Sequence, residues 1–231
     1  MLSRQERPTP IHSGAGTPHG ADGVRQLGHR EYVGGKWDEI GRLQFDYLVS
    51  RGLEPHHVLL DIACGSLRGG VHFIRYLDPG NYLGVDKEHE LVARGLEHEL
   101  PPDIREAKRP ELLVNDRFEF ERLSKRPDMA LAQSLFTHLP ASHIERCLAK
   151  LRAVAPAHHC FYATFLEVRR PVENPERPHD AMSWFYTRRQ MLKFGNRTGW
   201  RGTYIGDWDH PRDLKMVLYR PRRSVRRTSV R

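Results

Sequence analysis

Short apolar runs alternate with segments of helical periodicity along most of the chain. Runs of three to eight apolar or small residues predict buried strands, and apolar positions three or four apart predict amphipathic helices. A helix is predicted for residues 38–50, because Ile40, Leu43, Tyr47 and Leu48 share one face and Gly52 follows. Buried strands are predicted near residues 58–60, 81–86, 111–114, 128–134 and 160–165, with helices between them.

The last part of the chain has a different pattern. Residues 200–208 and 214–219 both read as strands, and the polar turn Asp209–Asp213 between them predicts a hairpin. Five strands alternating with helices predict a parallel sheet. The chain is therefore expected to form an α/β, doubly wound sheet of about seven strands. It should be mostly parallel, with an antiparallel C-terminal hairpin and helices on both faces.

Two sequence signals predict helix starts in the second half of the chain. Ser142 followed by Glu145, and Thr187 followed by Gln190, both have the spacing of a capping box. Each precedes a segment of helical periodicity. We therefore expect helices to begin close to Ser142 and Thr187.

Small residues follow the first strand, where a ligand can approach the backbone. Ala63, Cys64, Gly65 and Ser66 form a turn before the next helix, and Asp86 ends the second strand 21 residues beyond Gly65. That spacing fits a carboxylate that accepts hydrogen bonds from ribose hydroxyls.

The same turn lacks the glycines that a dinucleotide site needs at its first and third positions. Asp61, at the end of the first strand, would also repel a pyrophosphate. A cationic or zwitterionic nucleoside is favoured over NAD, and a dehydrogenase is a distant alternative.

The stretch Leu60–Ser66, Leu-Asp-Ile-Ala-Cys-Gly-Ser, resembles the first cofactor motif of class I S-adenosylmethionine-dependent methyltransferases. Ala63 replaces the usual first glycine, and Leu67 stands where a further glycine is common. The resemblance covers roughly residues 30–220, with several elements in the expected order. It implies a Rossmann-like fold and S-adenosylmethionine as the cofactor.

The resemblance and the sheet geometry together indicate the site residues. The family's contact with the adenine amino group falls on Asp116, with a turn cap by the Asn115–Asp116 pair as the alternative. Ligands of open α/β sheets bind at the carboxyl ends of strands, which places Gln133 near the transferred methyl group. The expected cofactor-binding residues are Asp61, Ala63, Cys64, Gly65, Asp86, Asp116 and Gln133.

His138 follows the fourth strand and is the candidate catalytic base, because a histidine titrates near neutral pH. The alternative is that His138 caps the following helix or orients the loop. No metal is expected, since the end of the fourth strand lacks acids, and His56–His57 and His158–His159 are adjacent pairs rather than spaced ligands.

Three further segments have open assignments. The long polar segment 167–184 is interpreted either as part of an acceptor pocket or as a solvated loop. The pocket candidates in and just after it are Arg169, Arg170, His179, Trp184 and Tyr186. Asp207, Trp208 and His210 either face the acceptor or close the sheet edge. Near the start, Tyr32, Gly34, Gly35 and Trp37 either cover the cofactor or pack the first helix onto the sheet.

Charge and composition set the domain limits. Residues 1–28 are rich in Pro, Gly, Ser, Thr and His and are expected to be a flexible leader. Six of the 37 Lys and Arg residues lie in 220–231, so 31 basic residues face 29 acidic residues elsewhere, a net charge of +2. A single domain at 29–220 and a disordered Arg-rich tail at 221–231 are predicted, and a nucleic-acid partner is not expected.

The three scattered cysteines are typical of reduced thiols, and no apolar run is long enough to span a membrane, so a cytoplasmic protein is expected. We predict an enzyme that methylates a small molecule at oxygen, with nitrogen and carbon as the alternative acceptor atoms. The alternatives are an RNA or protein methyltransferase anchored by the basic tail, and a non-catalytic S-adenosylmethionine-binding module. The sequence does not indicate the oligomeric state.

Overall fold

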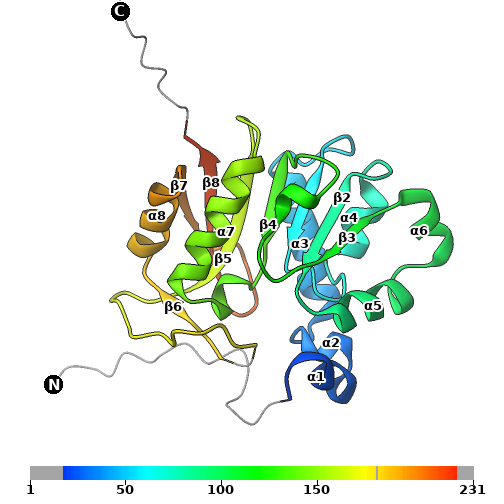
Figure 1. Ribbon diagram of the computed structural model, residues 1–231, viewed down its shortest axis with the longest axis horizontal. Coiled ribbons are helices and arrows are strands. Elements are labelled where there is room, and N and C mark those ends of the chain that lie inside the picture. Colours follow the sequence, from blue (N-terminus) through cyan, green and yellow to red (C-terminus); the bar gives the residue numbers. More distant parts are fainter. Residues whose placement is uncertain (1–17, 181, 223–231) are drawn as a thin grey trace, which may run out of the picture.

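A mixed β-sheet forms the centre of the protein (Figure 1). The computed structural model describes residues 18–180 and 182–222. The strands are β1 (Leu59–Ile62), β2 (Tyr82–Asp86), β3 (Glu111–Val114), β4 (Met129–Ala132), β5 (Cys160–Glu167), β6 (Phe185–Tyr186), β7 (Trp200–Gly206) and β8 (Lys215–Pro221).

The strand order is β3-β2-β1-β4-β5-β8-β7, and the two-residue β6 pairs beside β5. Strands β1 to β5 are parallel; Leu59 of β1, for example, pairs with Tyr82 on one side and Met129 on the other. The terminal hairpin runs antiparallel, with Tyr162 of β5 opposite Leu218 of β8. The predicted fold class is confirmed, including the antiparallel end of the sheet, and β6 adds one short strand.

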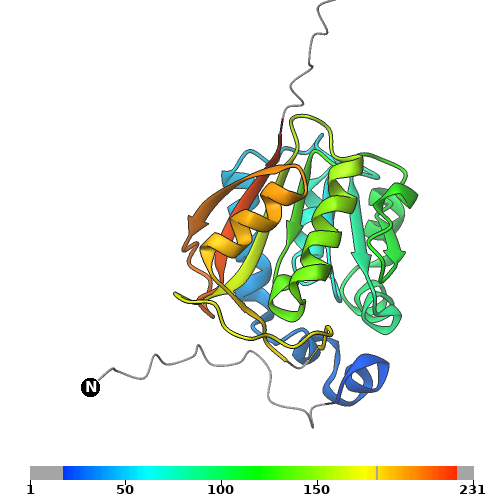
Figure 2. The same ribbon diagram turned by 60° about the vertical axis from the view of Figure 1, so that its left-hand side comes forward.

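Helices cover both faces of this sheet (Figures 1 and 2). Helices α3, α4, α5 and α6 contribute to the core on one face, and α7 and α8 pack on the other. The helices are α1 (Gly20–Leu27), α2 (His29–Tyr32), α3 (Trp37–Ser50), α4 (Gly70–Tyr76), α5 (His89–His98), α6 (Pro102–Lys108), α7 (Ala141–Val154) and α8 (Arg188–Arg197), with 3₁₀ turns at Phe120–Arg122 and Phe136–His138.

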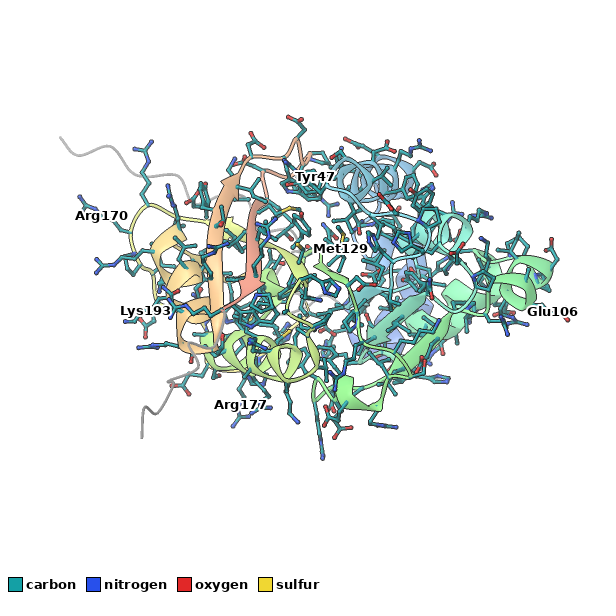
Figure 3. All side chains as sticks on the ribbon, turned by 90° about the horizontal axis from the view of Figure 1, so that it is seen from above. Tyr47, Glu106, Met129, Arg170, Arg177 and Lys193 are labelled. Atoms are coloured by element: carbon teal, nitrogen blue, oxygen red, sulfur yellow. The ribbon has the colours of Figure 1, made fainter. Side chains whose placement is uncertain are left out.

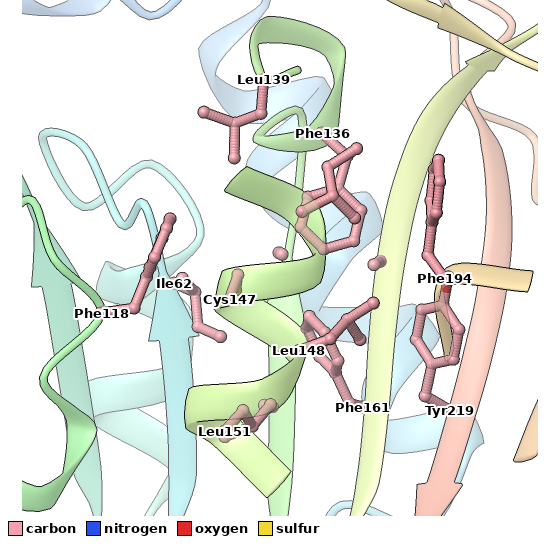
Figure 4. Close-up of a cluster of buried hydrophobic side chains, with 14 of the residues drawn as sticks. Ile62, Phe118, Phe136, Leu139, Cys147, Leu148, Leu151, Phe161, Phe194 and Tyr219 are labelled. Carbon is pink, nitrogen blue, oxygen red and sulfur yellow. The ribbon is translucent and has the colours of Figure 1, made fainter. Parts of the chain in front are cut away.

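The sheet divides the apolar interior into two cores because neighbouring strand residues point to opposite faces. Leu60 and Ile62 of β1 belong to the core under α7, whereas Leu59 belongs to the core under α3 and α4. In Figure 4, Cys147 and Leu148 of α7 point toward the sheet. All four residues of β1 are buried, so the strand is fixed at the centre and its carboxyl end has a defined position.

The N-terminal segment differs from the expected flexible leader. Residues 20–27 form α1, and Val24 of this helix is 2% exposed. The prediction of an unstructured segment up to residue 28 is therefore wrong for Gly20–Leu27, because Val24 finds a buried environment that composition alone does not reveal. Residues 1–17 and the tail from residue 223 lie outside the described residues, so the domain limits remain predictions.

The long segment after β5 is partly core and partly surface. Trp184 is fully buried, and its indole nitrogen donates to the carbonyl of Pro175 at 2.8 Å. Arg170 and Arg177 are exposed and project from the outside of the molecule in Figure 3. No helix in the described ranges has the length and apolarity needed to cross a bilayer.

Candidate active site

A cavity of about 430 Å³ opens at the carboxyl ends of the parallel strands. This is the edge where open α/β sheets bind ligands, and its volume lies in the usual range for small-molecule sites. All eight residues predicted as site residues line this one cavity, although they come from four strand ends. They are Asp61, Ala63, Cys64, Gly65, Asp86, Asp116, Gln133 and His138.

The turn after β1 has an unusual backbone. Ala63, Gly65 and Leu67 have φ values of 63°, 56° and 69°, in the left-handed region that favours glycine. The amide groups of Ala63 and Cys64 both donate to the carbonyl of Val85, at 2.7 and 3.1 Å. These bonds close the turn onto the end of β2, so its backbone forms one wall of the cavity.

Asp86 links this turn to the end of β2. One carboxylate oxygen accepts the N–H of Gly65 and the other accepts the N–H of Glu88, both at 2.8 Å. Burial raises the pKa of Asp86, although these two N–H donors oppose the shift. Each carboxylate oxygen keeps a second acceptor direction, which is what a pair of ligand hydroxyls would need.

Two other residues of the motif have less direct roles. The carboxylate of Asp61 accepts the hydroxyl of Tyr82 at 2.8 Å, and burial raises the pKa of Asp61 to about 7. The Cys64 thiol is buried against β2, where a methyl group on Gly84 would lie 3.1 Å from its sulfur. Burial raises the pKa of this thiol, so Cys64 lines the cavity as a protonated, unreactive thiol.

The hydrogen bonds after β3 distinguish the adenine contact from the turn cap, the two interpretations of Asn115–Asp116. The Asn115 side chain accepts the N–H groups of Arg117 and Glu119, so the turn cap falls on Asn115. The Asp116 side chain is 75% exposed at the cavity rim. Phe118, which the sequence analysis did not select, also lines the cavity, with φ 58° and 9% exposure.

Beyond β4, two candidate residues are held by neighbours. The Gln133 carbonyl oxygen accepts from Arg68 at 2.9 Å, and its amide nitrogen lies 3.0 Å from Nε2 of His210. Nδ1 of His138 lies 2.8 Å from the carbonyl oxygen of Met182. A carbonyl only accepts, so the neutral ring carries its proton on Nδ1 and its lone pair on Nε2.

No protein-family model matches the chain. Among solved structures, it is similar to a magnesium protoporphyrin IX methyltransferase from Synechocystis PCC 6803 with bound S-adenosylmethionine, at 13% identity over 90% of this chain and 86% of that chain, with a TM-score of 0.57. It is also similar to the glycopeptide N-methyltransferase MtfA complexed with S-adenosylhomocysteine, at 16% identity over 78% and 90%, with a TM-score of 0.60.

A third similar structure is CalO1, a methyltransferase in calicheamicin biosynthesis in its S-adenosylhomocysteine-bound form. Identity is 16% over 87% of this chain and 56% of that chain, with a TM-score of 0.56. The fold is that of the class I methyltransferases. At these identities the likeness concerns the fold, and the site must be argued from the residues of this chain.

On this methyltransferase fold, a roof of three residues covers the cavity. We define the roof as Tyr32 of α2, Lys87 after β2 and Asp180 of the segment after β5. The Tyr32 hydroxyl donates to Asp180 at 2.9 Å and accepts the N–H of Gly20, while Lys87 forms an ion pair with Asp180. Figure 2 shows α1, α2 and this segment together below the sheet.

The ion pair between Asp180 and Lys87 that holds the roof is present at neutral pH. Burial raises the pKa of Asp180, but the hydrogen bond and charge of Lys87 outweigh it, and the net shift is downward. Asp180 is therefore ionised and can hold Lys87 and Tyr32 together. Sequence reasoning proposed Tyr32 as cover and missed Asp180, for which no local pattern exists.

The predicted acceptor residues are mostly not at the cavity. Trp184 and Tyr186 are buried in the core, at 0% and 2% exposure, and Arg169 and Arg170 are exposed. The pocket assignment is wrong for Trp184 and Tyr186, because the segment after β5 packs these aromatic side chains into the core, and the exposed Arg169 and Arg170 fit the alternative of a solvated loop. Of the hairpin candidates, His210 reaches the site through Gln133, and its neighbour Arg212 lines the cavity directly.

The adjacent histidines His56 and His57 lie beside a third potential metal ligand, Glu54. The side chains of Glu54, His56 and His57 bring potential ligand atoms within 4.8 Å of one another at the amino end of β1. The two histidines are exposed or half-buried, and Nδ1 of His57 already accepts the N–H of Glu54. This cluster lies at the sheet edge opposite to the cavity and takes no part in its chemistry.

Proposed function

We propose that this protein is an S-adenosylmethionine-dependent methyltransferase that moves a methyl group to a small-molecule acceptor at oxygen. The observation that carries the proposal is the position of Asp86. Its carboxylate is anchored by the N–H of Gly65 in the turn after β1 and faces a cavity at the carboxyl edge of a methyltransferase sheet. The three similar structures described above carry S-adenosylmethionine or its product, which supports the same cofactor here.

The residues present fit this cofactor. Gly65 lies where a larger residue would be crowded, because an added Cβ would come 3.1 Å from Val33, and it leaves the backbone open. Asp86 offers acceptors to the ribose hydroxyls, and Phe118 and Leu91 provide apolar surface for the adenine. Asp61 also lines the cavity, and its carboxyl oxygens can accept hydrogen bonds from the methionine portion.

S-adenosylmethionine supplies an activated methyl group, so the protein needs chiefly to position the acceptor in line with it. In this chain Gln133 is fixed by Arg68 and His210, and it presents a rigid surface after β4. The roof of Tyr32, Lys87 and Asp180 lines the cavity and joins distant parts of the chain beside it. The site thus provides fixed groups that can orient an acceptor.

His138 is the proposed base. With Nδ1–H directed to the Met182 carbonyl, the neutral ring has its lone pair on Nε2, which is the atom proposed to take a proton from a hydroxyl of the acceptor. A hydroxyl loses its proton on methylation, so a base at this position supports an oxygen acceptor. The roofed cavity supports a small acceptor over an RNA or protein substrate anchored by the tail.

Isothermal titration with S-adenosylmethionine, S-adenosylhomocysteine and NAD tests the proposal. The two sulfur nucleosides should bind and NAD should not. Asp86→Ala should weaken S-adenosylhomocysteine binding at least about tenfold, since it removes two charge-assisted hydrogen bonds. His138→Ala is the matched variant and should retain the affinity, because His138 is assigned to the acceptor. Absence of nucleoside binding, or equal effects of the two variants, would contradict the assignment.

A further inference from the structure

Two arginines line the cavity without a carboxylate partner. Arg68 is 7% exposed and donates to the carbonyls of Val33 and Gly35, both at 3.0 Å, and to Gln133 at 2.9 Å. Its Nε–H is buried with no hydrogen-bond partner. Arg212 donates to the carbonyl of Gly34. Every partner of these two guanidinium groups among the described residues is neutral.

This arrangement leaves two guanidinium groups at the cavity without an ion-pair partner within residues 18–180 and 182–222. A buried cation is normally paired, because its desolvation is otherwise costly. Burial and the charge of Arg212 lower the pKa of Arg68 to about 10. Glu31 and Glu39 act on Arg212 through space, but neither forms an ion pair with it in the described part of the chain.

Asp61 acts on Arg68 through space without an ion pair between them, and the polar side chains beside the two arginines are those of Gln133 and His210. The amide nitrogen of Gln133 lies 3.0 Å from Nε2 of His210, and the backbone N–H of Arg212 lies 3.2 Å from its Nδ1; the neutral ring accepts a hydrogen bond at one of these two nitrogens. Burial, followed by the charges of Arg68 and Arg212, lowers the pKa of His210 to about 3. The histidine is therefore neutral and adds no charge to this wall of the cavity.

The sheet order shows which half of the cavity this wall occupies. Asp86 and Asp116 follow β2 and β3, on one side of β1. Gln133 follows β4, and Arg212 lies between β7 and β8, on the other side of β1. Under the proposed function the nucleoside occupies the β2–β3 side, so the arginines face the acceptor.

We propose that Arg68 and Arg212 form an anion subsite for the acceptor, so that the methylated small molecule carries a carboxylate close to the accepting hydroxyl. This inference rests on the proposed function and specifies its substrate class. Guanidinium groups suit planar carboxylates through paired N–H donors. Arg68 holds the glycine turn 33–35 in place with two of its donors, and its side chain lines the cavity beside Arg212.

The test uses benzoate and its neutral isostere benzamide as probes, titrated into the full-length chain saturated with S-adenosylhomocysteine. Benzoate should bind at least about tenfold more tightly than benzamide, because only benzoate offers charged acceptors. Arg212→Gln should abolish that preference. Arg201→Gln is the matched control, since Arg201 is exposed on β7 and its loss changes the net charge equally. Equal binding of the two probes, or a preference that survives Arg212→Gln, would overturn the proposal.

A second experiment shows whether the carboxylate that Arg212 binds belongs to the acceptor or to the cofactor. S-adenosylhomocysteine carries a carboxylate and 5′-methylthioadenosine does not. If Arg212→Gln weakens the first ligand and leaves the second unchanged, Arg212 binds the cofactor and the acceptor subsite is refuted. If neither nucleoside binds the unmodified chain, the proposed function fails, and benzoate against benzamide on the protein alone still tests the anion site.

Discussion

At the scale of single residues, the turn after β1 places a residue other than glycine in a left-handed backbone conformation. Ala63 occupies a left-handed conformation, φ 63°, in which its Cβ is strained. The turn is nevertheless held by two bonds to Val85 and by the bond from Gly65 to Asp86. The sequence comparison identified Ala63 as a departure from the motif, and the structure shows that the departure keeps the backbone path.

Ala63→Gly should therefore stabilise the fold. Glycine adopts this conformation without strain, and the gain should be about 0.5–1 kcal/mol after the greater freedom of the unfolded chain is included. Urea unfolding measures the change. Ala163→Gly is the control, because Ala163 is fully buried in extended strand β5 and loses packing there. Equal destabilisation by both substitutions would show that the turn carries no strain.

At the scale of elements, the two predicted capping boxes had different outcomes. The box at Thr187 is confirmed: its hydroxyl accepts the N–H of Gln190 at 3.2 Å, and the Gln190 side chain accepts the N–H of Thr187 at 2.9 Å. The box at Ser142 is wrong, because α7 already begins at Ala141 after Pro140. Proline fixes its own φ and suits a helix start, so Ser142 falls inside the first turn.

Thr187→Ala should destabilise the protein by about 1 kcal/mol, the typical loss for an N-cap side chain. Ser142→Ala should change stability by less than about 0.5 kcal/mol, since its hydroxyl caps no backbone group. Urea unfolding of the two variants under the same conditions compares them directly. A loss at Ser142 as large as that at Thr187 would restore the original prediction.

At the scale of the whole molecule, the roof joins three distant parts of the chain. Tyr32 and Asp180 are 148 residues apart, and their hydrogen bond connects the N-terminal helices to the segment after β5. The same hydroxyl accepts the N–H of Gly20 at the start of α1. This one side chain therefore couples the order of α1 to the covering of the cavity.

Tyr32→Phe should loosen the roof without unfolding the protein. Amide hydrogen exchange in residues 18–32 and 171–180 should become faster, because two hydrogen bonds to the same hydroxyl are lost. The control is Tyr76→Phe, whose hydroxyl donates to Leu53 at 3.1 Å, remote from the roof. Unchanged exchange in Tyr32→Phe would show that packing alone holds the cover.

Whereas α1 and β6 were found only in the structure, the sequence by itself determined the order of the seven main strands, the turn after β1 and the distance from Gly65 to Asp86. These features are local: periodicity, small residues and spacing along one βαβ unit specify them. It therefore also found residues that meet in one cavity, because parallel strands bring their carboxyl ends to the same edge.

Only the tertiary structure decided which side chains complete that cavity. Arg212 contacts Gly34 across 178 residues, Asp180 meets Tyr32, and Trp184 is drawn into the core. A loop residue carries no periodic signal that distinguishes a cavity wall from solvent or core. Its position depends on which apolar surfaces are buried first when the distant segments pack together, and that is a property of the whole chain.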